Sequence, residues 1–337
     1  MKIKKISEKI ISDLEQAKSE IKRADEIGNE LAKNINIIYL IGCGAPNRVM
    51  LGIEYWILQL SDSLEVRKYY PAEFMEQKPV KINNKTLFIF GSKSGTTKET
   101  VKAAEMISGR GYKTVAITES KNVPLAKFAD IVFSLGKSDE GHTGMFMILQ
   151  VLIGSIIHQK DKWKNHKQLI ESMYELPKVI YKTQEEYDEL CYKHAKHINN
   201  ENILYHLASG PMFTTAYVFS VCILMEMLWI HNYPIEAAEF FHGPFEIVDE
   251  NTFLLLMLGE DSSRPLMNRV VNFCKKYSNN LIIYDTRDFE MKGINEIIRP
   301  IVAPYVLNSV LKRIADHISQ MRNHPLTTRK YMWKTDY

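Results

Sequence analysis

The sequence predicts an α/β protein of two doubly wound lobes, each a parallel β-sheet with helices on both faces in a three-layer αβα arrangement. Three observations support this fold class. Short, continuous apolar segments alternate with helical patterns, which is typical of parallel strands buried on both faces. This set of segments occurs twice in the same order. The length of 337 residues suits two domains or one large pseudo-symmetric domain.

The internal repeat has a constant spacing. Tyr205 follows Tyr39 by 166 residues, and Gly210 follows Gly44 by the same number. The predicted strands are residues 38–44, 86–91 and 114–118 in the first copy, and residues 204–210, 253–259 and 281–285 in the second. The predicted helices are residues 50–60 and 98–109 in the first copy, and residues 213–230 and 265–277 in the second. The lobes are therefore expected to be two copies of one fold.

The remaining segments are predicted to be helical or to form a tail. We expect an N-terminal helix in residues 1–35, lobe one in 36–158, a helical linker in 159–201, lobe two in 202–321 and a C-terminal tail in 322–337. The linker carries charges at helical spacing, as a solvated helix does. A further helix is expected over residues 304–321.

Composition and charge exclude several classes of protein. With 43 Lys and Arg against 40 Asp and Glu, the net charge of +3 does not indicate a nucleic-acid binder. Four widely spaced cysteines and the absence of a secretory signal favour the cytoplasm. Residues 213–230 are nearly all apolar, but Glu226 lies within them, so a buried helix is expected rather than a membrane span.

A polar loop follows the second predicted strand of lobe one. Residues 91–100 contain two Ser, three Thr and two Gly and then open a helix. Backbone N–H groups at a helix start, with hydroxyls beside them, bind anions, and Gly95 lets the backbone turn close to a ligand. No Walker or dinucleotide fingerprint is present. The matching loop of lobe two, residues 259–264, holds two acids, which favours one phosphate per chain; the alternative is a second, weaker site at Arg264.

Two residues of lobe two are candidates for proton transfer. Glu226 is the only charge in its apolar helix, and desolvation is expected to raise its pKa towards neutrality. Sixteen residues later, His242 precedes Gly243-Pro244, which forces a turn. A purely structural role would also explain the presence of each of these two residues. No metal-binding spacing such as HxxxH or HExxH is present, and no catalytic-triad signal.

Together these motifs resemble the sugar isomerase (SIS) domain family, over most of the chain from about Ile37 onward. The matching parts are Gly42-Cys43-Gly44, the Ser-x-Ser-Gly-x-Thr loop at residues 92–97, and residues 239–244. The resemblance implies that Ser92, Ser94 and Thr97 hold a sugar 6-phosphate beside Gly44. It also implies that Glu226 and His242 are catalytic. Further candidates are Lys93, Glu140, Thr143, Arg264, Arg329 and Lys334.

Within the family, the sequence is similar to the fructosamine 6-phosphate deglycases and to the isomerase half of glucosamine-6-phosphate synthase. The synthase has a lysine where this chain has Ile223, and no glutaminase nucleophile stands at the N-terminus. Residues 239–248 and 259–264 look like the deglycases, as do Arg329, Tyr331 and Asp336-Tyr337 at the C-terminus. The resemblance therefore favours a deglycase.

This resemblance implies a reaction without cofactor or metal. A 6-phosphorylated hexose–amino acid adduct, such as fructoselysine 6-phosphate, would give a hexose 6-phosphate and a free amino acid through a 1,2-enaminol. His242 would open the sugar ring, and Glu226 would move a proton between C1 and C2. In relatives the histidine reaches the neighbouring subunit, so a homodimer is expected, with no nucleic-acid or membrane partner.

Two alternatives remain. One is a glucosamine-6-phosphate isomerase or deaminase, and the other is a non-catalytic regulator that binds a sugar phosphate. The amino acid that is released is not identified by the sequence. Lysine would favour an acidic lining and aspartate a basic one, and the candidates are Lys93, His206, Glu260, Asp261 and Arg264.

Overall fold

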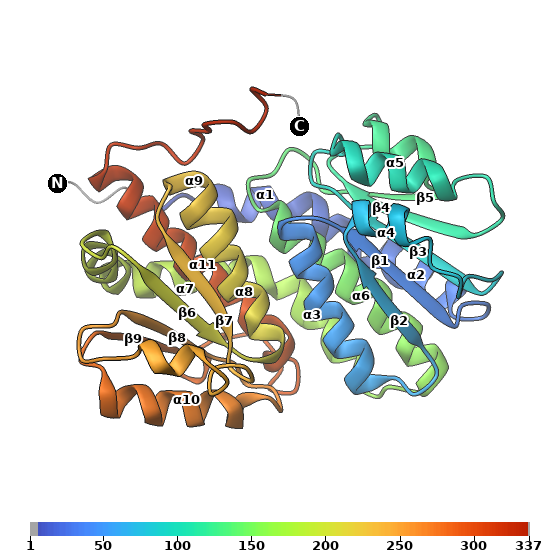
Figure 1. Cartoon of the computed structure of the whole chain (residues 1–337). Helices are drawn as coiled ribbons and strands as arrows, with labels where there is room; N and C mark the ends of the chain where they lie inside the picture. The colour runs from blue at the N-terminus through green and yellow to red at the C-terminus, as the bar shows by residue number, and fades with distance from the viewer. Residues whose placement is uncertain (1–5, 336–337) are drawn as a thin grey trace. The chain divides into compact units, whose positions relative to one another are not determined.

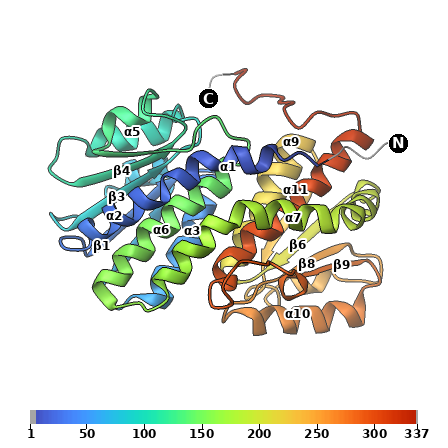
Figure 2. The same cartoon turned by 180° about the vertical axis from the view of Figure 1, so that it is seen from behind.

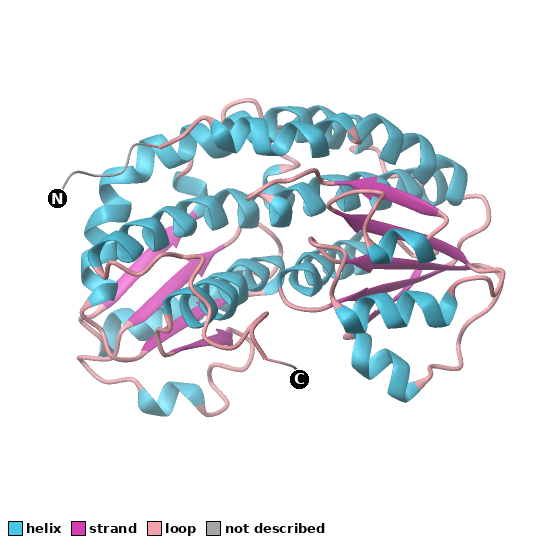
Figure 3. Ribbon diagram, turned by 90° about the horizontal axis from the view of Figure 1, so that it is seen from above, coloured by secondary structure: helices cyan, strands magenta, loops and turns pink. Residues whose placement is uncertain are grey.

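The computed structural model describes residues 6–335, and its contacts divide the chain into two compact units. One unit contains residues 7–178 and 293–298, and the other contains residues 179–292 and those from 299 onward. Each unit holds one parallel sheet with helices on both faces, as Figures 1 and 3 show. The predicted α/β fold class is confirmed.

The first unit contains a five-stranded sheet. Its strands are β1 (Ile37–Gly42), β2 (Glu65–Tyr69), β3 (Thr86–Gly91), β4 (Lys113–Thr118) and β5 (Ile131–Ser134). Its helices are α1 (Lys9–Ser19), α2 (Ile21–Leu31), α3 (Ala45–Leu60), α4 (Pro71–Gln77), α5 (Lys98–Ile107) and α6 (Gly141–Asp161). The strand order is β2-β1-β3-β4-β5, with every pair parallel. The order reverses between β1 and β3, which is where ligands bind in open α/β sheets.

Helices cover both faces of this sheet. Tyr39, Phe88 and Phe90 lie fully buried against Phe74 of α4 and the alanines of α5. On the other face α1, α2 and α6 pack together, as Figure 2 shows from behind. Helix α6 is buried almost all round and lacks an amphipathic pattern, which explains why periodicity alone does not identify it.

The second unit contains a four-stranded sheet with the same order, β7-β6-β8-β9. Its strands are β6 (Leu204–Ala208), β7 (Asn232–Glu236), β8 (Leu254–Leu258) and β9 (Leu281–Asp285). Its helices include α8 (Phe213–Tyr217), α9 (Glu226–Leu228), α10 (Arg264–Tyr277) and α11 (Arg299–Met321). Strands β2 and β7 lie at sheet edges and carry polar residues or proline, so they lack the apolar runs of the predicted strands.

Helix α7 (His166–Asn199) forms most of the predicted linker, and the division between the units falls inside it. The five-part division of the chain stays a prediction. Helix α11 begins at Arg299, earlier than expected, because Pro304 is accommodated inside the helix.

The apolar stretch predicted as one helix over residues 213–230 differs from that expectation. Between α8 and α9 the chain is wound as a π-helix, Val218–Met225, and the helix ends at Leu228 because Trp229 adopts a left-handed conformation with φ +57°. The Asn232 side chain donates to the carbonyls of Ser220 and Ile230 at 3.2 and 2.8 Å. π-Helical segments are rare and occur often at functional sites.

Two helical stretches have the length and hydropathy of membrane spans. In Gly141–Asp161 and Gly210–Leu228, 89% and 61% of the most apolar window is buried inside the protein. A core helix has this composition and this burial, so packing accounts for the apolar character of both.

Candidate active site

The loop between β3 and α5 is held in one conformation by Gly95. Its φ is +66°, and a Cβ atom there would lie 2.2 Å from Cγ2 of Val123 and 2.5 Å from Oγ1 of Thr118. Both contacts are far inside van der Waals distance, and the backbone conformation also disfavours any L side chain. Only glycine fits this position, and the loop is therefore fixed between β3 and the start of α5.

The loop hydroxyls form two pairs. Ser92 and Thr97 lie 2.8 Å apart, and Ser94 and Thr96 lie 2.9 Å apart, oxygen to oxygen. Ser92 also accepts from the backbone N–H of Gly95 and is buried, whereas Ser94 and Thr96 are exposed. The sequence-based candidates omit Thr96, although its hydroxyl lies beside that of Ser94. An anion at this loop would take over hydrogen bonds that the hydroxyls now make with one another.

The loop after β1 begins at the same level of the sheet. Gly42 and Gly91, the last residues of β1 and β3, are register partners. Gly44 has φ +60° with open space around it, so its backbone conformation selects glycine there. The buried Asn47 side chain donates to the carbonyls of Gly42 and Tyr69 and fixes this loop against β2. Gly44 and the hydroxyl loop thus flank the point where the strand order reverses.

Cys43 lies in the same loop but is poorly suited to be a nucleophile. Burial raises the pKa of its thiol, and a hydrogen bond with Thr100 offsets this only in part. A thiol with a raised pKa stays protonated at neutral pH. The chemistry of this site therefore depends on other groups.

Three further candidates lie together at the start of α6. The Lys93 side chain packs against Gly141, where an added Cβ would lie 2.9 Å from its Cδ. Glu140 and Thr143, on either side of Gly141, are buried at 6% and 1% exposure. The Glu140 N–H donates to Ser138 Oγ at 2.9 Å. All of these residues belong to the first unit, with the hydroxyl loop.

In the second unit, Glu226 directly follows the π-helix. Its carboxylate Oε1 lies 2.9 Å from Nη2 of Arg329, and its side chain is 28% exposed. Burial raises the pKa of Glu226, and the charge and hydrogen bond of Arg329 partly offset that shift. The expectation of a helix buried on most faces is wrong at this end, because the neighbouring Met225 and Trp229 are exposed.

His242 lies on the turn after β7. Gly243 has φ +134°, and Pro244 begins a short 3₁₀-helix. Phe240 of this turn is fully buried among Phe241, Phe245 and Phe273, so the turn is anchored while the imidazole is exposed. Within residues 6–335 the imidazole makes no hydrogen bond or ion pair.

Arg264 is fully engaged within the second unit. It donates to the Gly259 carbonyl at 2.7 Å and to both carboxylate oxygens of Asp285. Glu260 of the same loop pairs with Arg299 at 2.9 Å. Arg264 and Glu260 are thus each paired with a charge from another element, which does not favour a second anion site there.

Two of the remaining candidates, His206 and Lys334, contact neighbouring groups of the protein. His206 is fully buried in β6 and stacks on Phe219 with ring centroids 5.4 Å apart; burial lowers its pKa to about 3. Lys334 of the tail donates to the Arg329 carbonyl at 2.6 Å. Asp336 and Tyr337 lie outside the described residues. The candidates thus form two groups, one in each unit.

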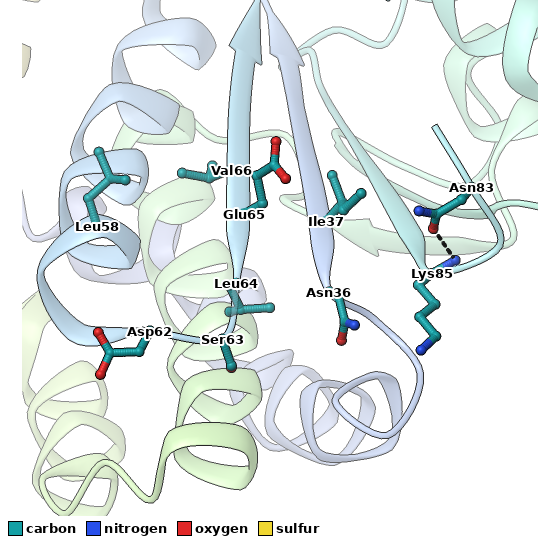
Figure 4. Close-up of a pocket in the computed structure, with 10 residues that line it drawn as sticks. All are labelled: Asn36, Ile37, Leu58, Asp62, Ser63, Leu64, Glu65, Val66, Asn83 and Lys85. Atoms are coloured by element: carbon teal, nitrogen blue, oxygen red, sulfur yellow. Dashed lines mark hydrogen bonds between the residues drawn. The ribbon is translucent and has the colours of Figure 1, made fainter. Parts of the chain in front are cut away.

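A cavity of about 530 Å³ lies at the opposite end of the first sheet from the hydroxyl loop. It is lined by residues that precede or begin β1, β2 and β3, among them Asn36, Asp62 and Lys85 (Figure 4). Lys85, Asn83 and Asp62 are exposed, and Glu65 pairs with Arg67 and Lys81. Among the residues described, no group of three or more His, Cys, Asp or Glu is placed to hold a metal ion.

Comparison with known proteins gives a consistent result. The SIS domain model matches residues 31–158. The chain is 37% identical to the fructosamine deglycase FrlB of Bacillus subtilis over 308 residues, which cover 90% of this chain and 94% of that protein. It is 24% identical to the fructoselysine 6-phosphate deglycase of Escherichia coli K12 over 97% of this chain and 94% of that protein.

Similar solved structures include one from Bacillus subtilis that is provisionally described as a phosphosugar isomerase. Its TM-score is 0.86 at 34% identity, with 94% of this chain and all of that chain covered. The similarity thus extends over both units of the chain.

Proposed function

Because this chain belongs to the SIS-domain family and is an enzyme of that family, we propose that it is a sugar-phosphate deglycase. Its substrate is a 6-phosphorylated Amadori-type hexose–amino acid adduct. The products are a hexose 6-phosphate and a free amino acid. The proposal includes a cytoplasmic location and a homodimeric state.

One observation carries this proposal: a half-buried carboxylate with a raised pKa, Glu226, in a chain 37% identical to a fructosamine deglycase. A general base works best when its pKa is near the working pH. The hydroxyl loop supports the phosphorylated form of the substrate, because hydroxyls and N–H groups at a helix start favour an anion.

The proposed mechanism starts with the closed sugar. His242 moves a proton from the anomeric hydroxyl to the ring oxygen and so opens the ring to the 2-ketose. Glu226 then takes a proton from C1 while the C2 oxygen gains a proton from solvent, which gives a 1,2-enaminol. Glu226 returns its proton to C2 as the amine nitrogen loses its own proton to solvent. The product is the C1 imine of the aldose. Water adds to this imine, and the amine leaves with a proton.

Phosphate binding supplies orientation. The phosphate is remote from C1 and C2 and does not react, so its binding energy can hold the open chain against the carboxylate. This arrangement requires no metal and no organic cofactor.

The test is Glu226→Gln, assayed for release of hexose 6-phosphate from fructoselysine 6-phosphate and from related adducts of other amino acids. We expect a loss on the order of 10²–10⁴-fold, typical of a general acid–base group. The matched control is Glu250→Gln, which removes an exposed carboxylate from a surface turn of the same unit. Turnover near the wild-type level in the Glu226 variant would refute the catalytic role.

The same assay separates the alternatives. Release of ammonia and hexose phosphate from glucosamine 6-phosphate, without cleavage of the adducts, would identify an isomerase or deaminase. Tight binding of a sugar phosphate without turnover of any substrate would identify a regulator.

A mixing experiment tests the dimeric site. Glu226→Gln and His242→Ala are each expected to be nearly inactive. If both residues of one site come from different subunits, subunit exchange gives a mixed dimer with one intact site and partial recovery of activity. No recovery after confirmed exchange would place both residues of a site in one subunit.

A further inference from the structure

The C-terminal tail places a cation against the proposed catalytic carboxylate. Arg329 follows Glu226 by 103 residues, and its Nη2 lies 2.9 Å from Oε1 of Glu226. The Arg329 side chain is 9% exposed, although it belongs to a tail outside any regular helix or strand. This contact joins the tail to the helix end that follows the π-helix.

The tail is folded around this guanidinium. Nη1 of Arg329 donates to the carbonyls of Leu326 and Thr328 at 2.8 and 2.9 Å. The centre of the Trp333 ring lies 5.4 Å from Cζ of Arg329, and the Lys334 ammonium donates to the backbone carbonyl of Arg329. The tail conformation therefore presents the guanidinium to Glu226 rather than to solvent.

Further contacts anchor the same tail to the unit. The His324 ring lies 4.7 Å from the ring of Trp229, the residue that ends the helix of Glu226. The Ser319 hydroxyl donates to the His324 carbonyl at 2.8 Å. The ring contact thus holds the tail to the helix end beside the ion pair, and the Ser319 bond ties the same part of the tail to α11.

Arg329 is the charged group that acts on the Glu226 carboxylate. Burial raises the pKa of Glu226, and the shift is opposed by the charge and hydrogen bond of Arg329. The preceding π-helix contributes no charged residue. Arg322, at the end of α11, donates to Asn199, and Lys334 donates to the tail backbone. His324 packs on Trp229.

We infer that Arg329 is the positioning residue of Glu226: it keeps the carboxylate ionised and oriented for proton abstraction. This inference rests on the proposed function. Without the cation, burial would raise the pKa of this carboxylate further and leave less of it in the ionised form that acts as a base. Arg329 itself stays charged and transfers no proton. The Nε–H of Arg329 is buried and has no hydrogen-bond partner in the described part of the chain.

The experiment compares Arg329→Ala, Arg329→Lys and Lys330→Ala in the full-length enzyme. Lys330 is the exposed neighbour in the tail, so its variant removes the same charge without touching Glu226. The measurement is kcat and kcat/KM from pH 5 to pH 9 with the adduct that the enzyme turns over. The acidic limb of the kcat/KM profile reports the pKa of the base in the free enzyme.

For Arg329→Ala we expect the acidic limb to move up by about one pH unit, which is about a tenfold loss on that limb. The loss should shrink as the pH rises, because the carboxylate then ionises without help. In Arg329→Lys the acidic limb should lie close to its wild-type pH, since lysine keeps the positive charge. The profile of Lys330→Ala should match that of the wild type.

Several outcomes would overturn the inference. Higher activity of Arg329→Ala would mean that the ion pair masks the base, and an equal loss at every pH would mean that the tail is only structural. An unmoved acidic limb would mean that Arg329 does not act on the base. The proposed function is tested separately: a wild-type enzyme that cleaves no phosphorylated adduct would refute it, whereas adduct cleavage that depends on Glu226 but shows an unshifted acidic limb in Arg329→Ala refutes this inference alone.

Discussion

The loops after β3 and β8 occupy the same place in two sheets of the same strand order, and they differ in their polar side chains; anion binding is proposed only for the first. Loop one, residues 92–97 after β3, carries hydroxyls that bond to one another and no carboxylate. In loop two, residues 259–264 after β8, Arg264 pairs with Asp285 of β9 and Glu260 pairs with Arg299 of α11. The two copies of the loop therefore differ in their polar contacts: hydroxyl pairs in the first and ion pairs with neighbouring elements in the second.

The difference also appears in the turn residue. Gly95 has φ +66° in loop one, where a side chain would overlap Val123. Ser263 follows Gly259 by four residues, as Gly95 follows Gly91, but it has an ordinary helical conformation and directly precedes α10. The tight turn that brings backbone N–H groups close to a ligand is therefore confined to loop one.

The largest effect is expected for Gly95→Ala. Left-handed strain together with overlap at Val123 and Thr118 should lower the free energy of unfolding by about 2–5 kcal/mol. The remaining folded enzyme should bind sugar phosphate poorly. Urea unfolding and KM measurements test both effects. The control is Gly109→Ala, at φ +73° but in open space, which should cost only about 1–2 kcal/mol and leave KM unchanged.

Arg264→Ala should reduce stability by about 2–3 kcal/mol, because it leaves the half-buried Asp285 without its partner. KM for a sugar phosphate should stay within about twofold of the wild-type value, since phosphate binding is proposed for loop one alone. A large rise in KM with little loss of stability would favour the second anion site at Arg264.

The same ion pair has a defined pH dependence. Burial alone would raise the pKa of Asp285, but the hydrogen bonds and charge of Arg264 outweigh it, and the folded-state pKa lies below the usual 3.8. The pair therefore stabilises the protein above about pH 4, and this contribution is lost as the pH falls through the folded-state pKa. Acid unfolding of Arg264→Ala should accordingly differ from the wild type most at neutral pH and least at the acid end. A constant difference would contradict this linkage.

Ser94→Ala should raise KM for the phosphorylated substrate by about tenfold, the effect of one hydrogen bond to a charged group. Its stability should change little, because Ser94 is exposed and its hydroxyl pairs only with Thr96. An unphosphorylated adduct serves as the comparison substrate, and its kcat/KM should not respond to the variant. An equal response of both substrates would argue against phosphate contact.

The smallest effect is expected for Ser263→Ala in loop two. Its hydroxyl donates to Ser209 at 2.9 Å, which joins two loops of the second unit. Loss of this bond should cost about 1 kcal/mol in the free energy of unfolding and leave KM for the sugar phosphate unaltered. A rise in KM as large as that expected for Ser94→Ala would contradict the proposal that only loop one contacts the phosphate.

Much of the fold was predictable from the sequence. The strands β1, β3, β4, β6 and β8 are mostly apolar because each lies inside a sheet and is buried over most of its length. Strand β9 lies at a sheet edge and was predicted because Leu281–Tyr284 is apolar. The repeat of 166 residues indicated two sheets before any contact was known. The edge strands β2 and β7 carry polar residues or proline, and the all-round buried α6 has no amphipathic period, so these elements lack the signals on which such predictions depend.

By itself the sequence determined the α/β class, the repeat and the hydroxyl loop, because these depend on short segments with local periodicity or a local turn. Tertiary structure decided which charges meet. Glu226 faces Arg329 from 103 residues away, and Arg264 is neutralised by Asp285 from a neighbouring strand end. Such partners are set by how elements pack against one another, and the order of residues along the chain carries no direct record of that packing.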